Sequence, residues 1–90
     1  MFKIIYHHLV VRVDIPRLPA EWKRNISRAI QERLSAYPDL YGKPLRRSLK
    51  GYRKLRAGDY RVIFRIEKNT VKIIIIQHRR VVYEEAHKRI

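Results

Sequence analysis

The sequence of 90 residues predicts a single α+β domain, residues 1–90, in which helices pack against a small antiparallel sheet. Two observations predict this fold class. An apolar stripe with helical spacing lies in the first half of the chain, and three short apolar runs separated by turn residues fill the second half. The apolar fraction of 46% is typical of a folded globular domain.

The first half begins with a predicted strand at residues 2–6, which are rich in strand-favouring residues. Residues 8–15 fit both the alternation of a strand and the spacing of a helix, so the residues alone leave this segment open. A helix is predicted to start at Pro19, where a missing N–H costs nothing, and to end at Pro38. Its apolar stripe comprises Trp22, Ile26, Ala29, Ile30, Leu34 and Tyr37.

The second half predicts a loop at residues 39–48, followed by three antiparallel strands at 49–56, 60–66 and 71–77. Lys68-Asn69 is the predicted two-residue turn between the last two strands. The last strand is apolar on both faces, so we expect it inside the sheet. The chain is predicted to end in a short helix at residues 84–90. With helices grouped together, the sheet is expected to carry them on one face.

Strand alternation assigns the side chains of the middle strand to two faces. The core face is predicted to comprise Tyr60, Val62, Phe64 and Ile66. A turn at Lys68-Asn69 sets Arg61 opposite Ile76. With this register Ile75 joins the core face, whereas Ile76 and His78 join the face that carries Arg61.

The same face gathers positive charge that the fold does not require. A turn at Ala57-Gly58 sets Lys54 opposite Arg61 and near Arg56, although a three-residue loop would shift this register. Directly opposed like charges destabilise a sheet. A phosphate would neutralise them, and arginine offers it a planar fork of donors.

Two functions are open for such a phosphate site. The basic residues could only hold a nucleic-acid backbone, or they could stabilise a reacting phosphate. In the second case the 2′-OH of RNA attacks the adjacent phosphate, which gives a 2′,3′-cyclic phosphate and a 5′-hydroxyl without a metal. His7 and His8 have no clustered acids, and we expect neither a metal nor a cofactor.

The composition indicates the kind of partner and the compartment. The formal net charge of +14 predicts a polyanionic partner. The absence of cysteine excludes disulfides, thiolate nucleophiles and thiolate-bound zinc. The longest apolar run, residues 73–76, is too short to span a membrane, and the N-terminus lacks the apolar stretch of a secretory signal. We therefore expect a cytoplasmic protein without membrane association.

The chain resembles the RelE branch of the RelE/ParE superfamily, the toxins of type II toxin–antitoxin systems. The resemblance is carried by LYGKPLRRSLKGYRKLRAGDYRVIFRI and QHRRVVY, and it extends to DIPRLP and the amphipathic helix after it. It implies a small antiparallel sheet packed against an N-terminal helical hairpin, which would make residues 8–15 helical. It also implies cleavage of mRNA in the ribosomal A site, with the ribosome, its mRNA and rRNA as partners.

The resemblance implies a role for each matching residue. Lys54, Arg61 and Arg79 would hold and stabilise the phosphate, with Arg80 as the competing match for Arg79, and Tyr83 would orient or activate the 2′-OH. Further RNA contacts are expected from Lys50, Arg53, Arg56, His78 and Arg80. Tyr52 stands where some members have a second lysine. A cognate antitoxin is the implied inhibitor, in a hetero-oligomer, and we expect the free toxin to be a monomer.

Two other functions remain open at this point. A ParE-type toxin, which poisons DNA gyrase, shares the fold and the basic charge but usually lacks the full set of lysine, arginine and tyrosine. A catalytically inactive relative would bind nucleic acid in a salt-sensitive way without turnover.

Overall fold

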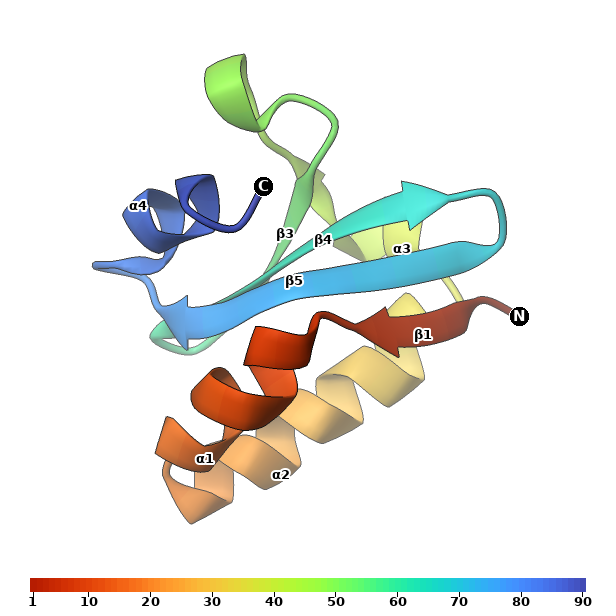
Figure 1. The fold of residues 1–90 in the computed structure, drawn as a ribbon. Helices are drawn as coiled ribbons and strands as arrows, with labels where there is room; N and C mark the ends of the chain where they lie inside the picture. Colours follow the sequence, from red (N-terminus) through yellow and green to blue (C-terminus); the bar gives the residue numbers. More distant parts are fainter.

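Five strands form one mixed sheet in the spatial order β1-β5-β4-β3-β2 (Figure 1). The computed structural model describes all of residues 1–90. The three predicted antiparallel strands are β3 (Arg53–Ala57), β4 (Tyr60–Glu67) and β5 (Thr70–His78). The short strand β2 (Lys43–Pro44) extends the sheet beyond β3, and β1 (Lys3–Tyr6) lies parallel to β5. Strand β5 is thus an inner strand, as its two apolar faces predict.

Two helical arms form a hairpin over one face of the sheet (Figure 1). The arms comprise the π-helix η1 (Val10–Asp14) with α1 (Ile15–Arg17), and α2 (Ala20–Ala29) with the π-helix η2 (Ile30–Leu34). Helical residues from His8 onward confirm the expectation that came from the family resemblance. Leu18 has an extended backbone and Pro19 precedes α2, and together they separate the arms. Every helix of the structure is too short or too polar to cross a lipid bilayer.

The main hydrophobic core lies between this hairpin and the sheet. Ile26, Ile30 and Leu34 of the predicted helical stripe are buried there. Val62 and Phe64 are buried in the same core, as strand alternation predicts. Tyr37, the last predicted member of the stripe, is 59% exposed. The helix ends before it, so helical spacing no longer applies at that position.

A second, smaller core lies on the opposite face of the sheet, beneath α4 (Val82–His87) (Figure 1). Val82 and Ala86 pack there against Ile63 and Ile75. The predicted C-terminal helix is therefore present, but it covers the other face from the hairpin. The sheet carries helices on both faces rather than on one, because its inner strands are apolar on both faces.

The segment predicted as a loop, residues 39–48, contains short regular elements. Helix α3 (Pro38–Tyr41) precedes β2, and the 3-10 helix η3 (Arg47–Leu49) follows it. Strand β3 begins later than predicted for two reasons. Leu49 is buried in the second core as part of η3, and Gly51 turns the chain with a φ of +95°, a conformation that favours glycine.

A β-bulge in β5 changes the pairing of β4 with β5. Ile74 is an extra residue at this point, so Arg61 pairs with Gln77 and not with the predicted Ile76. One extra residue reverses the alternation of all side chains beyond it. Three residues therefore lie on the face opposite to the predicted one: Ile75, Ile76 and His78.

The hairpin between β3 and β4 turns at Gly58-Asp59 rather than at the predicted Ala57-Gly58. Gly58 adopts a φ of +60° there, which glycine does without strain. The new register sets Arg56, and not Lys54, opposite Arg61. The three basic side chains still share one face of the sheet.

A buried ion pair between Asp14 and Arg89 completes the edge of the sheet beyond the end of β1. Arg89 donates from Nη1 and Nη2 to the two carboxylate oxygens, at 2.6 and 2.8 Å. Asp14 also accepts from the backbone N–H of Ile76 at 2.9 Å, and Arg89 donates to the carbonyl of the bulged Ile74 at 3.1 Å. The two side chains are 0% and 8% exposed. The pair thus satisfies backbone groups of β5 that β1 does not reach.

His7 lies beside this ion pair in an environment that favours its neutral form. Burial lowers the pKa of His7, and the positive charges of His8 and Arg89 lower it further, against the opposing effect of Asp14. Its Nδ1 accepts a hydrogen bond from the backbone N–H of Leu9 at 3.1 Å. A neutral imidazole avoids a second positive charge next to Arg89.

We expect Arg89→Ala to destabilise the protein strongly, because the Asp14 carboxylate would stay buried without its partner. Breaking a buried ion pair from one side costs about 3–5 kcal/mol, a large share of the ~5–15 kcal/mol that stabilises a small domain. Urea unfolding followed by circular dichroism measures the free energy of unfolding. Lys88→Ala is the control, because it removes only the exposed pair of Lys88 with Glu85 and should change little. Equal stability of Arg89→Ala and wild type would contradict the role of the pair.

Candidate functional site

The basic face of the sheet is the part that α4 leaves uncovered. Strand alternation sends Lys54 and Arg56 of β3 and Arg61 of β4 to the same face as α4. Helix α4 packs over Ile63 and Ile75, toward the other side of the sheet from β3. None of the three basic side chains lies within ion-pair distance of a carboxylate. Their positive charge is therefore available to a ligand.

A hollow of about 210 Å³ lies among these side chains. This basic hollow is lined by Tyr41, Lys43, Lys54, Arg56 and Arg61. Tyr41 and Lys43 come from α3 and β2, and the pairing of β2 with β3 sets Lys43 opposite Lys54. Sequence reasoning missed both residues, because a strand of two residues leaves no periodic signal. Apart from Tyr41, the lining residues are all basic, so the basic hollow is suited to an anion.

Arg61 is the most deeply placed cation of this hollow, with only 8% of the residue exposed. Its Nη1 donates to the carbonyl oxygens of Gly58 and Tyr60, at 2.8 and 2.9 Å. These bonds fix the guanidinium at the tip of the β3–β4 hairpin, but they do not neutralise it. A buried charge without a charged partner is costly, and a bound phosphate would supply that partner.

Lys54 links the basic hollow to α4. Its Nζ lies 5.6 Å from the ring centroid of Tyr83, a cation–π contact. Tyr83 is half-buried in the first turn of α4 and packs against the second core. The structure therefore brings together the predicted lysine and the predicted tyrosine, which are far apart in sequence.

Arg79 is held at the same hairpin tip as Arg61. Its backbone N–H donates to the carbonyl oxygen of Asp59 at 2.8 Å, and its Nε lies 3.8 Å from Oδ1 of that aspartate. Arg80 is exposed, and its backbone N–H donates to Nδ1 of His78 at 3.2 Å. Of the two arginines that competed for one role in the sequence, Arg79 is thus the one attached to the turn that also holds Arg61.

His78 lies on the other face of the sheet from Lys54, because the bulge at Ile74 reverses the alternation. The His78 ring meets the Tyr60 ring edge-on, with 5.7 Å between the ring centroids. The Tyr60 ring in turn lies 5.5 Å from the Trp22 ring, again between centroids. The prediction that His78 shares the arginine face is therefore wrong. The imidazole is part of an aromatic cluster at the end of the helical hairpin.

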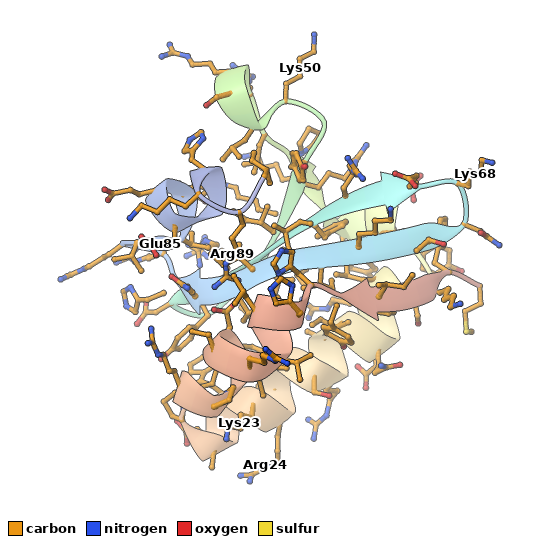
Figure 2. The ribbon with its side chains drawn as sticks, in the orientation of Figure 1. Lys23, Arg24, Lys50, Lys68, Glu85 and Arg89 are labelled. Carbon is orange, nitrogen blue, oxygen red and sulfur yellow. The ribbon has the colours of Figure 1, made fainter.

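Two other predicted contact residues also lie away from the basic hollow. Arg53 alternates to the face opposite Lys54, and its Nη1 donates to the carbonyl oxygens of Gly42 and Asp39 at 2.8 and 3.3 Å. These bonds give Arg53 a structural role between β3 and α3. Lys50 is exposed after η3 and projects away from the sheet (Figure 2).

The remaining basic residues on this face of the sheet have acidic partners. Arg65 and Lys72 both contact Glu67, at 2.9 and 3.1 Å. The hydrogen bond from Lys72 and the nearby positive charges lower the pKa of Glu67. Tyr52, at the position where some relatives have a lysine, packs on the second core with Arg65 over its ring at 5.8 Å. Unpaired charge is therefore concentrated at the basic hollow and not spread over the face.

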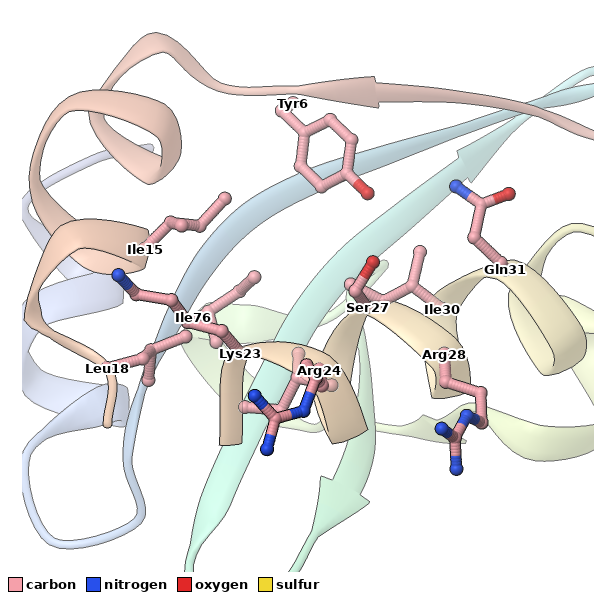
Figure 3. Close-up of a pocket in the computed structure, with 11 residues that line it drawn as sticks. Tyr6, Ile15, Leu18, Lys23, Arg24, Ser27, Arg28, Ile30, Gln31 and Ile76 are labelled. Carbon is pink, nitrogen blue, oxygen red and sulfur yellow. The ribbon is translucent and has the colours of Figure 1, made fainter. Parts of the chain in front are cut away.

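A larger groove of about 590 Å³ lies on the other side of the molecule, within the helical hairpin (Figure 3). Its wall includes Ile15, Leu18 and Ile26, and Lys23, Arg24 and Arg28 lie along α2 at its rim. Tyr6 of β1 also lines it, and burial raises the pKa of the Tyr6 hydroxyl. The lining of this apolar groove thus combines an apolar wall with cationic side chains at its rim.

Known proteins are similar to this chain in sequence and in fold. Residues 2–83 match the family described as the ParE toxin of type II toxin–antitoxin systems, parDE. Toxin RelG of Mycobacterium tuberculosis is 38% identical over 74 residues, which cover 80% of this chain and 85% of that protein. The structure of the toxin–antitoxin complex RelBE2 from the same organism matches with a TM-score of 0.80 and 32% identity, over 87% of this chain and 98% of that chain.

A more distant structure has the same fold. The RelB–RelE antitoxin–toxin complex of Methanococcus jannaschii matches with a TM-score of 0.70 at 19% identity, over 90% of this chain and 96% of that chain. The family match covers nearly the whole sequence, and the relatives with more than 30% identity are toxins of the RelE type. The chain is therefore a type II toxin of the RelE/ParE superfamily, as its motifs predict.

Proposed function

We propose that this toxin is a metal-independent endoribonuclease that cleaves mRNA in the ribosomal A site. The observation that carries the proposal is the buried guanidinium of Arg61, which lines the basic hollow and has no carboxylate partner. The similarity to toxin RelG supports the same branch of the superfamily. The net charge of +14 suits a site enclosed by rRNA, and the ribosome would place the activity in the cytoplasm.

In the proposed reaction the 2′-oxygen of one nucleotide attacks the phosphorus of the next phosphate. The bond from phosphorus to the 5′-oxygen breaks, which leaves a 2′,3′-cyclic phosphate and a 5′-hydroxyl. The 2′-OH gives up one proton, and the departing 5′-oxygen takes one. Because the substrate supplies the nucleophile, the protein needs only to align it, stabilise the added negative charge and assist proton transfer.

The geometry suggests a role for each residue. Arg61 and Arg79, both attached to the Gly58-Asp59 turn, would stabilise the negative charge on the phosphate. Lys54 would hold the phosphate from β3, and Tyr83 beside it would orient the 2′-OH. The positive charges of lysine and arginine stabilise the phosphate directly, so the proposed reaction needs no metal ion.

A ParE-type function, inhibition of DNA gyrase, is the second candidate, because the matched family is described as ParE toxin. It would use the same fold and charge without a reactive site. The full set of Lys54, Arg61, Arg79 and Tyr83 favours the endoribonuclease. A third function is nucleic-acid binding without turnover. Tyr52 stands where some relatives have a lysine and packs on the second core, so one cation of the site is missing here, and activity assays test this outcome.

We further propose that the apolar groove of the helical hairpin binds an amphipathic acidic segment of a cognate antitoxin. Two solved structures of similar fold, RelBE2 and RelB–RelE, are complexes of a toxin with its antitoxin. In this chain an apolar wall lies next to Lys23, Arg24 and Arg28, so an apolar and acidic segment would complement the groove in both respects.

Replacing Arg61 by Ala is expected to slow mRNA cleavage on translating ribosomes by about 10²–10³-fold, the usual effect of removing one preorganised donor to a developing negative charge. The measurement is the single-turnover cleavage rate with purified protein. Arg12→Ala, which removes the same charge from an exposed helical position, is the control and should cleave normally. Because Arg61 is buried, circular dichroism must show that the Arg61→Ala variant is folded. Tyr83→Phe removes only the hydroxyl that would orient the 2′-OH, and it should also slow cleavage.

Cleavage by Arg61→Ala at the wild-type rate would contradict the assignment of the site. Trapped DNA breaks in the presence of gyrase, without mRNA cleavage, would instead support the ParE-type function. Salt-sensitive RNA binding without either activity would indicate an inactive relative.

The double variant Arg24→Glu/Arg28→Glu is expected to weaken antitoxin binding at least tenfold, because it reverses the charge at the rim of the apolar groove. The binding partner for the assay is the product of the neighbouring reading frame if that frame encodes a short acidic protein, and titration calorimetry measures the affinity. Lys3→Glu/Lys68→Glu makes the same change of charge on exposed residues elsewhere. Equal affinities for the two double variants would argue against docking in this groove.

A further inference from the structure

Tyr41 is a large aromatic residue that stays 45% exposed beside the basic hollow. A single exposed aromatic residue is common on protein surfaces. This one differs because the other residues that line the same hollow are all cations, and because neither stabilising the core nor forming the proposed reactive site requires it.

The structure holds Tyr41 firmly in this place. Helix α3 ends immediately after it, and the backbone N–H of Gly42 donates to the carbonyl oxygen of Pro38 at 2.9 Å. A side chain at Gly42 would collide with the buried ring of Phe64, so this segment packs closely against the core. Arg53 anchors the same segment through the carbonyl of Gly42. The backbone next to Tyr41 is thus held by hydrogen bonds and by packing against the core.

The surroundings of the ring combine an aromatic plane with unpaired positive charge. The guanidinium carbon of Arg33 lies 5.5 Å from the ring centroid, a cation–π contact from the helical hairpin. Lys43 and Arg56 line the hollow next to the ring, and neither has an acidic partner. An aromatic plane beside an anion site matches a nucleotide, which has a base next to a phosphate.

The position of this surface relates it to the reactive site. Lys54 lines the basic hollow and also contacts the ring of Tyr83. Tyr83 itself does not line the hollow. A phosphate held between Lys54 and Tyr83 would therefore have the hollow as its immediate neighbour on the β2 and β3 side. The next nucleotide of a single strand would extend into it.

We propose that the part of the basic hollow formed by Tyr41, Lys43 and Arg56 is a subsite for a nucleotide flanking the scissile phosphate, in which the base stacks on Tyr41 while Lys43 and Arg56 bind its phosphate. Arg61 and Lys54, which line the same hollow, stay with the scissile phosphate. This subsite rests on the proposed endoribonuclease function. Tyr41 is a binding residue in this account and takes no part in proton transfer. Since every base has an aromatic face, the subsite contributes affinity and placement with little sequence preference.

The test uses a fluorescent RNA hexanucleotide with 2′-O-methyl groups, which the proposed reaction cannot cleave, and fluorescence anisotropy as the readout. Tyr41→Ala is expected to raise Kd about tenfold, within the usual effect of losing one stacked base. Tyr41→Phe retains the ring and should bind like wild type. Tyr37→Ala removes a neighbouring exposed aromatic ring that does not line the hollow, so it should also bind like wild type.

Kinetics on ribosomes separate this proposal from the proposed function. If both hold, Tyr41→Ala raises KM and leaves kcat close to wild type, whereas Arg61→Ala lowers kcat. If the toxin cleaves mRNA and Tyr41→Ala binds and cleaves like wild type, the subsite is wrong and the endoribonuclease stands. If no cleavage occurs but Tyr41→Ala still weakens RNA binding, the nucleotide subsite stands without the reaction. Equal loss of binding in Tyr41→Phe and Tyr41→Ala would overturn stacking.

Discussion

The buried ion pair of Asp14 and Arg89 is the interaction that attaches the C-terminal end of the chain, and with it the α4 side of the site, to the sheet. It joins η1, the bulge of β5 and the C-terminal end of the chain at one point. Burying two charges is costly, and here the cost is offset by bidentate geometry and by hydrogen bonds to the backbone of β5. A helix as short as α4 is not stable alone. Its position, and with it that of Tyr83, depends on this pair and on the small core beneath Val82.

The distribution of acidic residues explains how so basic a protein keeps one cationic site. Only 8 Asp and Glu residues are available to 22 Lys and Arg residues. Three of them neutralise charge around the sheet: Asp14, Asp59 and Glu67. The basic hollow has none of them, although Arg61 in it is nearly buried. Such unneutralised charge opposes folding, and a bound polyanion would relieve it.

The sequence predicts those features that have a period, and it misses those that do not. The stripe of α2 and the core face of β4 follow from spacing and alternation, and both are confirmed. The bulge in β5 falls within residues 73–76, which are all isoleucine, so a shift of one residue leaves no trace in the pattern. Because of that shift, His78 lies on the face opposite to Lys54 and not on the predicted one. The parallel pairing of β1 and the side-chain bonds of Arg53 are long-range contacts without a local signal. Tyr41 and Lys43 could not be predicted either, because the elements that carry them are too short to show a period.

The central claim is that the toxin cuts mRNA by using the 2′-OH of the substrate, with the basic face stabilising the phosphate. The most direct measurement uses two mRNAs on translating ribosomes, one of them carrying a single 2′-deoxynucleotide immediately 5′ of the scissile phosphate. We expect the ribonucleotide substrate to be cut to a 2′,3′-cyclic phosphate and a 5′-hydroxyl, and the deoxy substrate to remain intact at that position. Cleavage of both substrates at the same rate, or a product with a 5′-phosphate, would contradict this account.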